Sequence, residues 1–94
     1  SSFVAASDVY KRQVTRIPAL IGRGDMADCR LHGESISRVH AKLAYADANF
    51  ILEDIESTNG TCVNDYPLKK GYPVLLFPGD EVSFGSERYE FRVC

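Results

Sequence analysis

Apolar and polar positions alternate with a period of two along most of this 94-residue chain. In residues 89–93 a tyrosine, a phenylalanine and a valine alternate with charged residues, and segments 82–84 and 41–45 repeat the pattern. Such alternation is typical of a strand with one face in the core and one face in water. Segment 50–52 is apolar at every position, which predicts a central strand.

Turn-forming residues separate these apolar segments at short intervals. They cluster at 47–49, 59–60, 69–71, 78–80 and 85–86, and the Pro-Gly pair in the fourth cluster suits the two central positions of a type II turn. Nowhere do apolar residues recur at helical spacing over ten or more positions. Many short strands with turns and no helix predict an all-β sandwich or barrel.

The amino-terminal part of the chain predicts further strands. Segments 3–6 and 14–17 are apolar enough to form the first two, with polar residues 8–13 as the loop between them. A third apolar pair, Leu20-Ile21, then leads into Gly22-Arg23.

Length and composition describe one globular domain. Ninety-four residues, 45% of them hydrophobic, leave no room for a second core. A chain of this size buries roughly 60–65% of the surface that it exposes when unfolded. No apolar run is long enough to span a bilayer, and no signal-peptide pattern opens the chain. Because the chain begins at Ser1-Ser2 without a methionine, we expect a domain excised from a longer protein.

Charge and cysteine content narrow the choice of partners. Eleven basic and 13 acidic residues give a net charge of −2, whereas nucleic-acid binding needs a dense basic face. Cys29, Cys62 and Cys94 are an odd and widely spaced set, which is not typical of a disulfide framework. We therefore expect a reducing, cytoplasmic setting, no nucleic acid and no membrane contact by this domain, and a local site for any anion.

The candidate chemistry lies in four short motifs. These are Gly22-Arg23, Ser37-Arg38-Val39-His40, Ser57-Thr58-Asn59-Gly60 and Val63-Asn64. Glycine adopts positive φ without penalty, so the Asn-Gly pair allows a sharp reversal that would hold up the hydroxyls of Ser57 and Thr58. Alone, such a pair is typical of an ordinary hairpin.

Together and in this order, the motifs resemble the forkhead-associated (FHA) domain, whose pattern is Gly-Arg, then Ser-x-x-His, then Asn-Gly preceded by Ser or Thr. The resemblance covers residues 17–93, and residues 1–16 would hold the first strands or, in part, a linker or cloning remnant. It implies a β-sandwich of two mainly antiparallel sheets, as in FHA and SMAD domains, with binding loops at one end. It also implies a non-catalytic module that binds phosphothreonine peptides without cofactor or metal, and we expect a monomer.

The resemblance divides the motif residues into two groups. Residues that contact the phosphopeptide are Arg23, Ser37, Arg38, Thr58 and Asn59, and residues that support the site are Gly22, His40, Gly60 and Asn64. In the family, the residue at Thr58 bonds the phosphate and the side chain at Asn59 bonds the peptide main chain beside the phosphothreonine. Gly60 would serve through its backbone alone, and Asn64 would steady the loop.

The residue types suit a phosphate group. Phosphothreonine carries close to two negative charges and three acceptor oxygens, so its receptor needs a guanidinium and a few hydroxyl or amide donors. The planar fork of Arg23 can bond two oxygens at once, and Gly22 and Gly24 would let the backbone turn tightly enough to aim it. Ser37 can donate a hydrogen bond and Arg38 can add charge. Composition alone also allows two solvated arginines and a turn-capping serine.

His40 stands where the second motif meets the apolar segment 41–45. A histidine here could ligate a metal or catalyse. The simpler interpretation is a buried imidazole whose two nitrogens tie adjacent loops together.

The resemblance also suggests where selectivity arises. Threonine over serine would follow, as in the family, from a pocket for the γ-methyl group. The family often discriminates at the third residue after the phosphothreonine, and our candidates for that surface are Glu34, Ser35 and loop 85–88. A Glu34 side chain facing the peptide would favour a basic residue there.

The residues leave three other functions open. A hydrolytic triad of Ser37, His40 and Asp54 would lack a Gly-x-Ser-x-Gly elbow. A metal site would start from Cys29-Arg30-Leu31-His32, completed by Cys62 or His40, but this single pair has no matching second pair. The third is a phosphate-independent interaction domain of the same fold that uses a sheet face. If phosphate is bound, Ser/Thr kinase signalling is the expected context, and the compact loops favour a bacterial parent.

Overall fold

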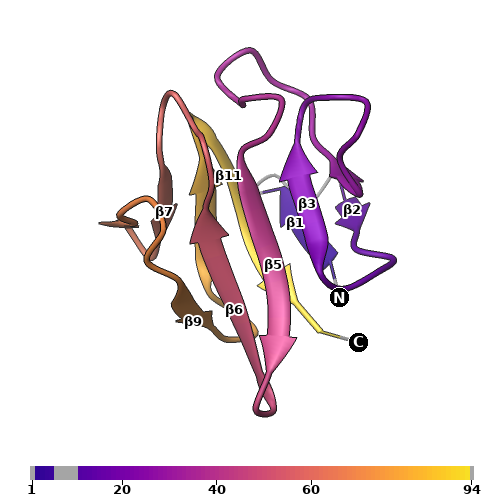
Figure 1. Cartoon of the computed structure of the whole chain (residues 1–94), viewed down its shortest axis with the longest axis vertical. Coiled ribbons are helices and arrows are strands. Elements are labelled where there is room, and N and C mark those ends of the chain that lie inside the picture. The colour runs from indigo at the N-terminus through magenta and orange to yellow at the C-terminus, as the bar shows by residue number, and fades with distance from the viewer. Residues whose placement is uncertain (1, 6–10, 94) are drawn as a thin grey trace.

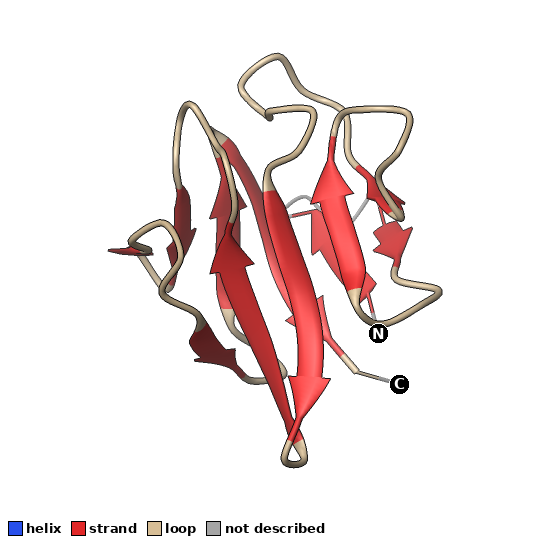
Figure 2. Ribbon diagram, in the orientation of Figure 1, coloured by secondary structure: helices blue, strands red, loops and turns tan. Residues whose placement is uncertain are grey.

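The computed structural model describes residues 2–5 and 11–93, and these residues form strands and loops without a helix (Figures 1 and 2). The strands are β1 (Ser2–Ala5), β2 (Lys11–Gln13), β3 (Ala19–Gly22), β4 (Cys29–Arg30), β5 (Ala41–Ala46), β6 (Asn49–Asp54), β7 (Thr61–Val63), β8 (Tyr66–Pro67), β9 (Val74–Leu76), β10 (Glu81–Phe84) and β11 (Glu87–Arg92). One sheet has the order β2-β1-β11-β10-β7-β8, and the other has the order β4-β3-β5-β6-β9. Only the β3–β4 pair is parallel among the described strands. The predicted all-β sandwich of two mainly antiparallel sheets is confirmed.

The core lies between the two sheets and follows the predicted alternation. In β11, Tyr89 and Phe91 are buried and Arg92 is exposed. The ring of Phe3 on β1 packs 5.4 Å, centroid to centroid, from Phe84 and from Phe91. Burying one such side chain contributes about 1.5–3 kcal/mol, so these rings join β1, β10 and β11 firmly. Segment 50–52 is part of β6, which lies between β5 and β9 as a central strand.

The second strand differs from its prediction. We expected it at 14–17, but β2 is Lys11–Gln13, inside the segment expected to be a loop. β2 is the edge strand of its sheet and pairs with β1 alone through the main chain, so it needs no apolar alternation. Val14 is buried just after it, whereas Ile17 is exposed. The first predicted strand corresponds to β1; Ala6 and residues 8–10 of the predicted segments lie outside the described residues.

The alternation also ends before Tyr45. Ala41 and Leu43 are fully buried, but Tyr45 is 54% exposed, because its pair with Phe50 is the last but one before the turn of the β5–β6 hairpin. Figure 1 shows this hairpin at the bottom of the molecule. Its ring packs edge-on against Phe50, 4.9 Å away.

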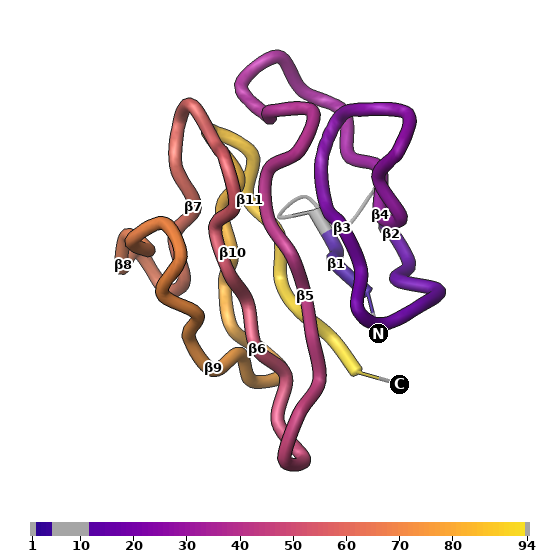
Figure 3. The backbone as a smooth tube through the Cα atoms, viewed as in Figure 1, coloured from indigo at the N-terminus to yellow at the C-terminus, as the bar shows by residue number. Residues whose placement is uncertain are grey.

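The predicted site loops gather at one end of the sandwich, at the top of Figure 3. Loops 23–28, 31–40 and 55–60 lie there with the β10–β11 turn. Main-chain hydrogen bonds join them: Arg23 N donates to Ser37 O at 2.9 Å, and Gly85 N donates to Gly60 O at 2.9 Å. Since β6 and β7 belong to different sheets, loop 55–60 crosses between sheets and its Asn-Gly pair is no hairpin turn.

Two further sequence inferences concern turns and membranes. Pro78-Gly79 forms the predicted type II turn, because Gly79 has φ +93° and Asp80 N donates to Phe77 O at 3.0 Å. None of the described residues forms a helix capable of crossing a membrane.

Candidate functional site

Arg23 follows directly after β3 and is held at one point of its side chain. Its Nε donates to Ile36 O at 2.9 Å. The two terminal nitrogens bond no other described residue. The guanidinium is therefore oriented by its Nε, while its fork stays available for two oxygens of an anion.

Gly22 and Gly24 allow two loops to approach closely. Neither has a positive φ, and the expected turn begins at Gly24, where Ala27 N donates to Gly24 O at 3.2 Å. A Cβ at Gly22 would lie 2.1 Å from Arg38 O, and one at Gly24 would lie 3.0 Å from Arg38 Cβ. The missing side chains let the start of loop 23–28 lie directly against residues 37–38, which brings Arg23 and Arg38 together.

Ser37 presents a hydroxyl with its proton available. Thr58 N donates to Ser37 Oγ at 3.0 Å, so the oxygen accepts there and its own hydrogen can point elsewhere. The side chain of Arg38 is exposed and makes no hydrogen bond or ion pair with the described residues. An open pocket of about 350 Å³ is lined by Arg23, Ser37, Arg38, Val39, Glu56 and Thr58. The structure thus brings four of the five predicted contact residues to one pocket.

Asn59 lies beside this pocket and bridges two loops. Its Nδ2 donates to Ser35 O at 2.9 Å and so joins loop 55–60 to loop 31–40. The side-chain oxygen has no described partner and the residue is exposed, so an acceptor remains for a main-chain N–H of a bound peptide.

His40 lies fully buried beneath the loops. Ser37 N donates to Nδ1 at 3.0 Å, and the distance from Nε2 to Gly60 O is 2.9 Å. Because Nδ1 accepts, the ring is neutral and donates through Nε2. Burial lowers the pKa of His40 from its ordinary value, against the opposing effects of the Gly60 hydrogen bond and the charge of Asp54. The imidazole ties loops 31–40 and 55–60 together, as expected.

Asp54 anchors loop 55–60 to the end of β6. The sequence suggested this residue only as a member of a hydrolytic triad. This buried carboxylate at the end of β6 accepts hydrogen bonds from the hydroxyls of Ser57 and of Thr61, the latter at 2.7 Å. Gly60 N in turn donates to Ser57 Oγ at 3.1 Å. The hydroxyl of Ser57, expected to be held up, is therefore buried and committed. An Asp three residues before a Ser is a turn signal that the sequence does contain.

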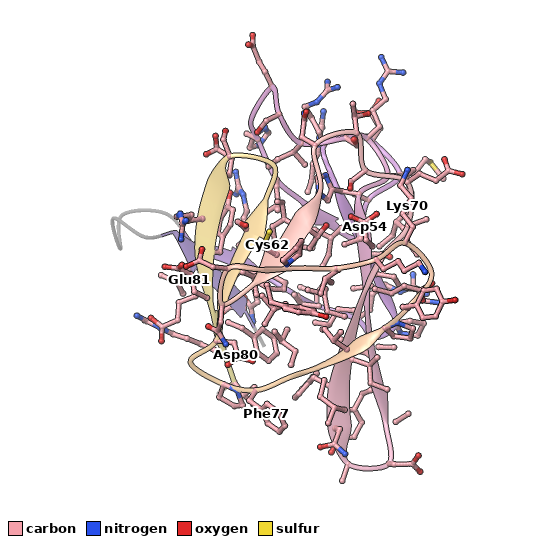
Figure 4. The ribbon with its side chains drawn as sticks, turned by 90° about the vertical axis from the view of Figure 1, so that its left-hand side faces the viewer. Asp54, Cys62, Lys70, Phe77, Asp80 and Glu81 are labelled. Atoms are coloured by element: carbon pink, nitrogen blue, oxygen red, sulfur yellow. The ribbon has the colours of Figure 1, made fainter. Side chains whose placement is uncertain are left out.

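Asn64 does not support the site as expected. Its Nδ2 donates to Asp80 Oδ1 at 3.0 Å, and its Oδ1 accepts from Glu81 N at 2.9 Å. It follows the end of β7 that lies away from Gly60. Asp80 and Glu81 lie below Asp54 in the view of Figure 4. Asn64 joins the β7–β8 turn to β10 and not to loop 55–60.

The residues expected to read the third peptide position divide into two groups. Ser35 Oγ lies 2.9 Å from Ser86 Oγ and accepts from Ser86 N at 2.9 Å. Gly85 has φ +61°, and a Cβ added there would lie 2.5 Å from Ser35 O. The β10–β11 turn is therefore packed directly against loop 31–40. Exposed Glu34 precedes this rigid surface. Arg88 instead bonds Glu81 and Asp65 and is not part of it.

The described residues are not arranged as either a hydrolytic triad or a metal site. Both His40 nitrogens bond the main chain, and Asp54 bonds Ser57 and Thr61, so Ser37, His40 and Asp54 form no relay. Burial raises the pKa of the Cys29 thiol to about 11. The described residues contain no group of three or more His, Cys, Asp or Glu placed to hold a metal ion.

Comparison with known proteins gives consistent results. The family model for the FHA domain matches residues 19–85. The chloroplastic zeaxanthin epoxidase of Prunus armeniaca is 30% identical over an alignment of 86 residues, which covers 81% of this chain and 13% of that protein. The FHA domain-containing protein FhaA of Mycobacterium tuberculosis is 36% identical over 74 residues, 79% of this chain and 14% of that protein.

A solved structure from work on phosphothreonine-dependent FHA domain interactions superposes with a TM-score of 0.83 at 28% identity, covering 99% of this chain and 95% of that one. The chain spans only a small part of the two curated relatives named above. Since the family match covers most of the chain, the protein belongs to the FHA domain family.

Proposed function

We propose that this domain binds phosphothreonine-containing segments of partner proteins and performs no catalysis. The observation that carries the proposal is the fork of Arg23, held through Nε and facing a pocket that it shares with Ser37, Arg38 and Thr58. These groups supply guanidinium and hydroxyl donors, which phosphate oxygens require. The phosphothreonine dependence reported for an FHA structural relative supports the same ligand.

The charges of the pocket favour an anion. Arg23 and Arg38 bring two positive charges, and Glu56 brings one negative charge. Each charge-assisted hydrogen bond contributes about 1.5–3 kcal/mol, and association costs several kcal/mol of lost freedom. We therefore expect reversible binding with micromolar dissociation constants.

Hydrogen bonds between the loops hold the pocket in place. Thr58 N, Ser37 Oγ and the His40 ring already connect loops 31–40 and 55–60. Little conformational entropy would be lost at these loops on binding, which favours affinity.

Calorimetric titration tests the proposal. The domain is titrated with a degenerate phosphothreonine peptide pool, with the unphosphorylated pool, and again as the Arg23→Ala and Arg16→Ala variants. The matched control, Arg16, loses the same charge from a side chain that is 74% exposed; it pairs with Asp28 at 3.8 Å, at the far end of loop 23–28 from Arg23, and does not line the pocket. We expect heat only with phosphate, a loss of roughly 30-fold or more in affinity for Arg23→Ala, and little change for Arg16→Ala.

Two outcomes would contradict this function. Equal binding of both pools would indicate a phosphate-independent interaction domain. Wild-type affinity in Arg23→Ala would place the phosphate elsewhere.

We further propose that the domain serves kinase-dependent signalling inside the cell. Cys29 and Cys62 are both free thiols, which supports a reducing compartment. Treating a lysate with phosphatase before affinity capture should remove the partners that the domain retains. Retention of the same proteins after treatment would contradict this context.

A further inference from the structure

A second pocket adjoins the first and shares two of its arginines. It encloses about 300 Å³ and is lined by Arg23, Gly24, Asp25, Arg30 and Arg38. The residues that it adds come from loop 23–28 and from β4, whereas Thr58 lines only the first pocket. Three guanidinium groups therefore border one small volume.

Arg30 reaches this pocket because of its place in β4. Its neighbour Cys29 is buried, so Arg30 projects from the opposite face of the strand. Its Nε donates to Arg23 O at 3.0 Å, and its Nη2 lies 3.1 Å from Asp25 Oδ1. Its Nη1 bonds none of the described residues, so Arg30, like Arg23, is fixed through Nε with donor capacity left over.

The local charge is positive in an acidic chain. Three arginines and one carboxylate, Asp25, give the pocket a net charge of +2, whereas the chain as a whole carries −2. Asp25 is 88% exposed, so water weakens its compensation of the three cations. Like charges gathered in this way raise the local affinity for an anion.

We propose that this pocket takes a second anionic group of the bound peptide, either a phosphoryl group or a carboxylate, next to the phosphothreonine. The inference rests on the function proposed above and narrows it to peptides with clustered negative charge. Because the two pockets share Arg23 and Arg38, the groups that fill them must be close. An extended chain advances about 3.3 Å per residue, so the second anion belongs to a residue within about three positions.

Arg30 could instead be a structural latch that holds Arg23 O and Asp25. A latch uses only Nε and Nη2, and its loss would weaken all peptides alike or lower stability. An anion site uses Nη1 of Arg30 together with Arg38, which bonds none of the described residues, and loss of Nη1 would weaken only the peptides with a second negative charge. The two roles therefore differ in a ratio of affinities rather than in an affinity.

The test measures that ratio. One phosphothreonine peptide is made with neutral neighbours, then with an aspartate or a second phosphothreonine scanned through the three positions on either side. Each is titrated into the wild type, Arg30→Gln and the charge-matched control Arg16→Gln. We expect the best acidic peptide to bind roughly fivefold or more tightly than the neutral one in the wild type and in Arg16→Gln. In Arg30→Gln the ratio should fall to nearly one, whatever the change in affinity for the neutral peptide, because loss of the hydrogen bond to Arg23 O acts on all peptides alike.

Each outcome has a distinct meaning. A larger gain from phosphothreonine than from aspartate identifies the phosphoryl group as the second anion, and equal gains identify any carboxylate-sized charge. An unchanged ratio in Arg30→Gln, or no preference in the wild type, overturns the second site while leaving phosphothreonine binding intact. Absence of binding by any phosphopeptide overturns both proposals.

Discussion

The two ends of the sandwich connect their strands in different ways. At the loop end, residues 31–40 and 55–60 are irregular, and their polar groups bond to buried His40 and Asp54. At the opposite end, β5 and β6 are joined by a two-residue turn at Asp47 and Ala48, with φ of +53° and +64°. There the chain reverses through its own geometry and needs no distant partner.

This difference couples stability to binding at one end only. Irregular backbone must find hydrogen-bond partners, and at the loop end these partners are the same side chains that position the pocket. The hairpin end carries instead an apolar hollow of about 600 Å³, lined by Ile17, Tyr45, Phe50 and Val93. Changes at the loop end should lower stability and affinity together, and changes at the hairpin end should affect stability alone.

The largest effect is expected for Asp54→Ala. Removal of this buried carboxylate leaves the donors of Ser57 and Thr61 unpaired and should lower the free energy of unfolding by about 3 kcal/mol. Affinity for the phosphothreonine pool should fall as well, because Gly60 N is held by the same Ser57. Urea unfolding and calorimetry measure the two quantities.

Asp80→Ala is the matched control for this change. Asp80 also accepts two hydrogen bonds in a turn, from Phe77 N and from Asn64, but it is less buried and lies away from the site. We expect a loss of about 1 kcal/mol with unchanged peptide affinity. An effect of Asp54→Ala no greater than that of Asp80→Ala would mean that the loop end does not depend on its buried network.

Gly22→Ala should come next. The added Cβ would meet Arg38 O at 2.1 Å, so the main chain of loop 31–40 must move, at a cost of about 2 kcal/mol. The shift displaces Arg38, and affinity should fall more than tenfold. Gly24→Ala provides a graded comparison, because its Cβ would lie at 3.0–3.1 Å from Arg38 and needs a smaller movement. Equal tolerance of both changes would contradict the close-approach explanation.

The alternation of apolar and polar residues predicted the strands that have one buried face. The period-two alternation located β5, β10 and β11, because a strand with one buried face selects apolar residues at every second position. It missed β2, since an edge strand that pairs through its main chain imposes no such selection. It also extended the buried face to Tyr45, because the sequence does not show where a hairpin passes beyond the opposite sheet.

The motifs also grouped residues that meet in space. The structure brings four of the five predicted contact residues, Arg23 and Ser37 among them, to one pocket, and their contact with a phosphopeptide stays a prediction. Three-dimensional proximity explains the misses. Gly22 is required by the approach of residues 37–38, Asn64 bonds Asp80 and Glu81 across the sheet, and Arg30 reaches the pocket only because β4 lies parallel to β3.

Acid should weaken the loop end through His40. Its folded-state pKa is lowered by burial, so the unfolded chain binds a proton more readily. Stability is therefore fully present above the unfolded pKa of about 6.5 and falls as the pH drops below it towards the folded value. The slope from this group is at most about 1.4 kcal/mol per pH unit. Urea unfolding between pH 7.5 and 5.5 measures it.

The other histidine provides the control for this pH dependence. His32 is exposed, so His32→Gln should keep the wild-type slope, whereas His40→Gln should flatten it. A slope that His40→Gln leaves unchanged would assign the acid sensitivity to carboxylates instead.

The smallest effect is expected at the hairpin end, from Ala48→Gly. Ala48 adopts φ +64°, where a Cβ is strained and glycine is not. Relief of this strain exceeds the extra entropy that glycine gives the unfolded chain, so the free energy of unfolding should rise by about 0.5–1 kcal/mol. Peptide affinity should not change, because the turn makes no contact with the loop end. A stabilised variant with altered phosphopeptide affinity would show that the two ends are coupled through β5 and β6, the strands that connect them.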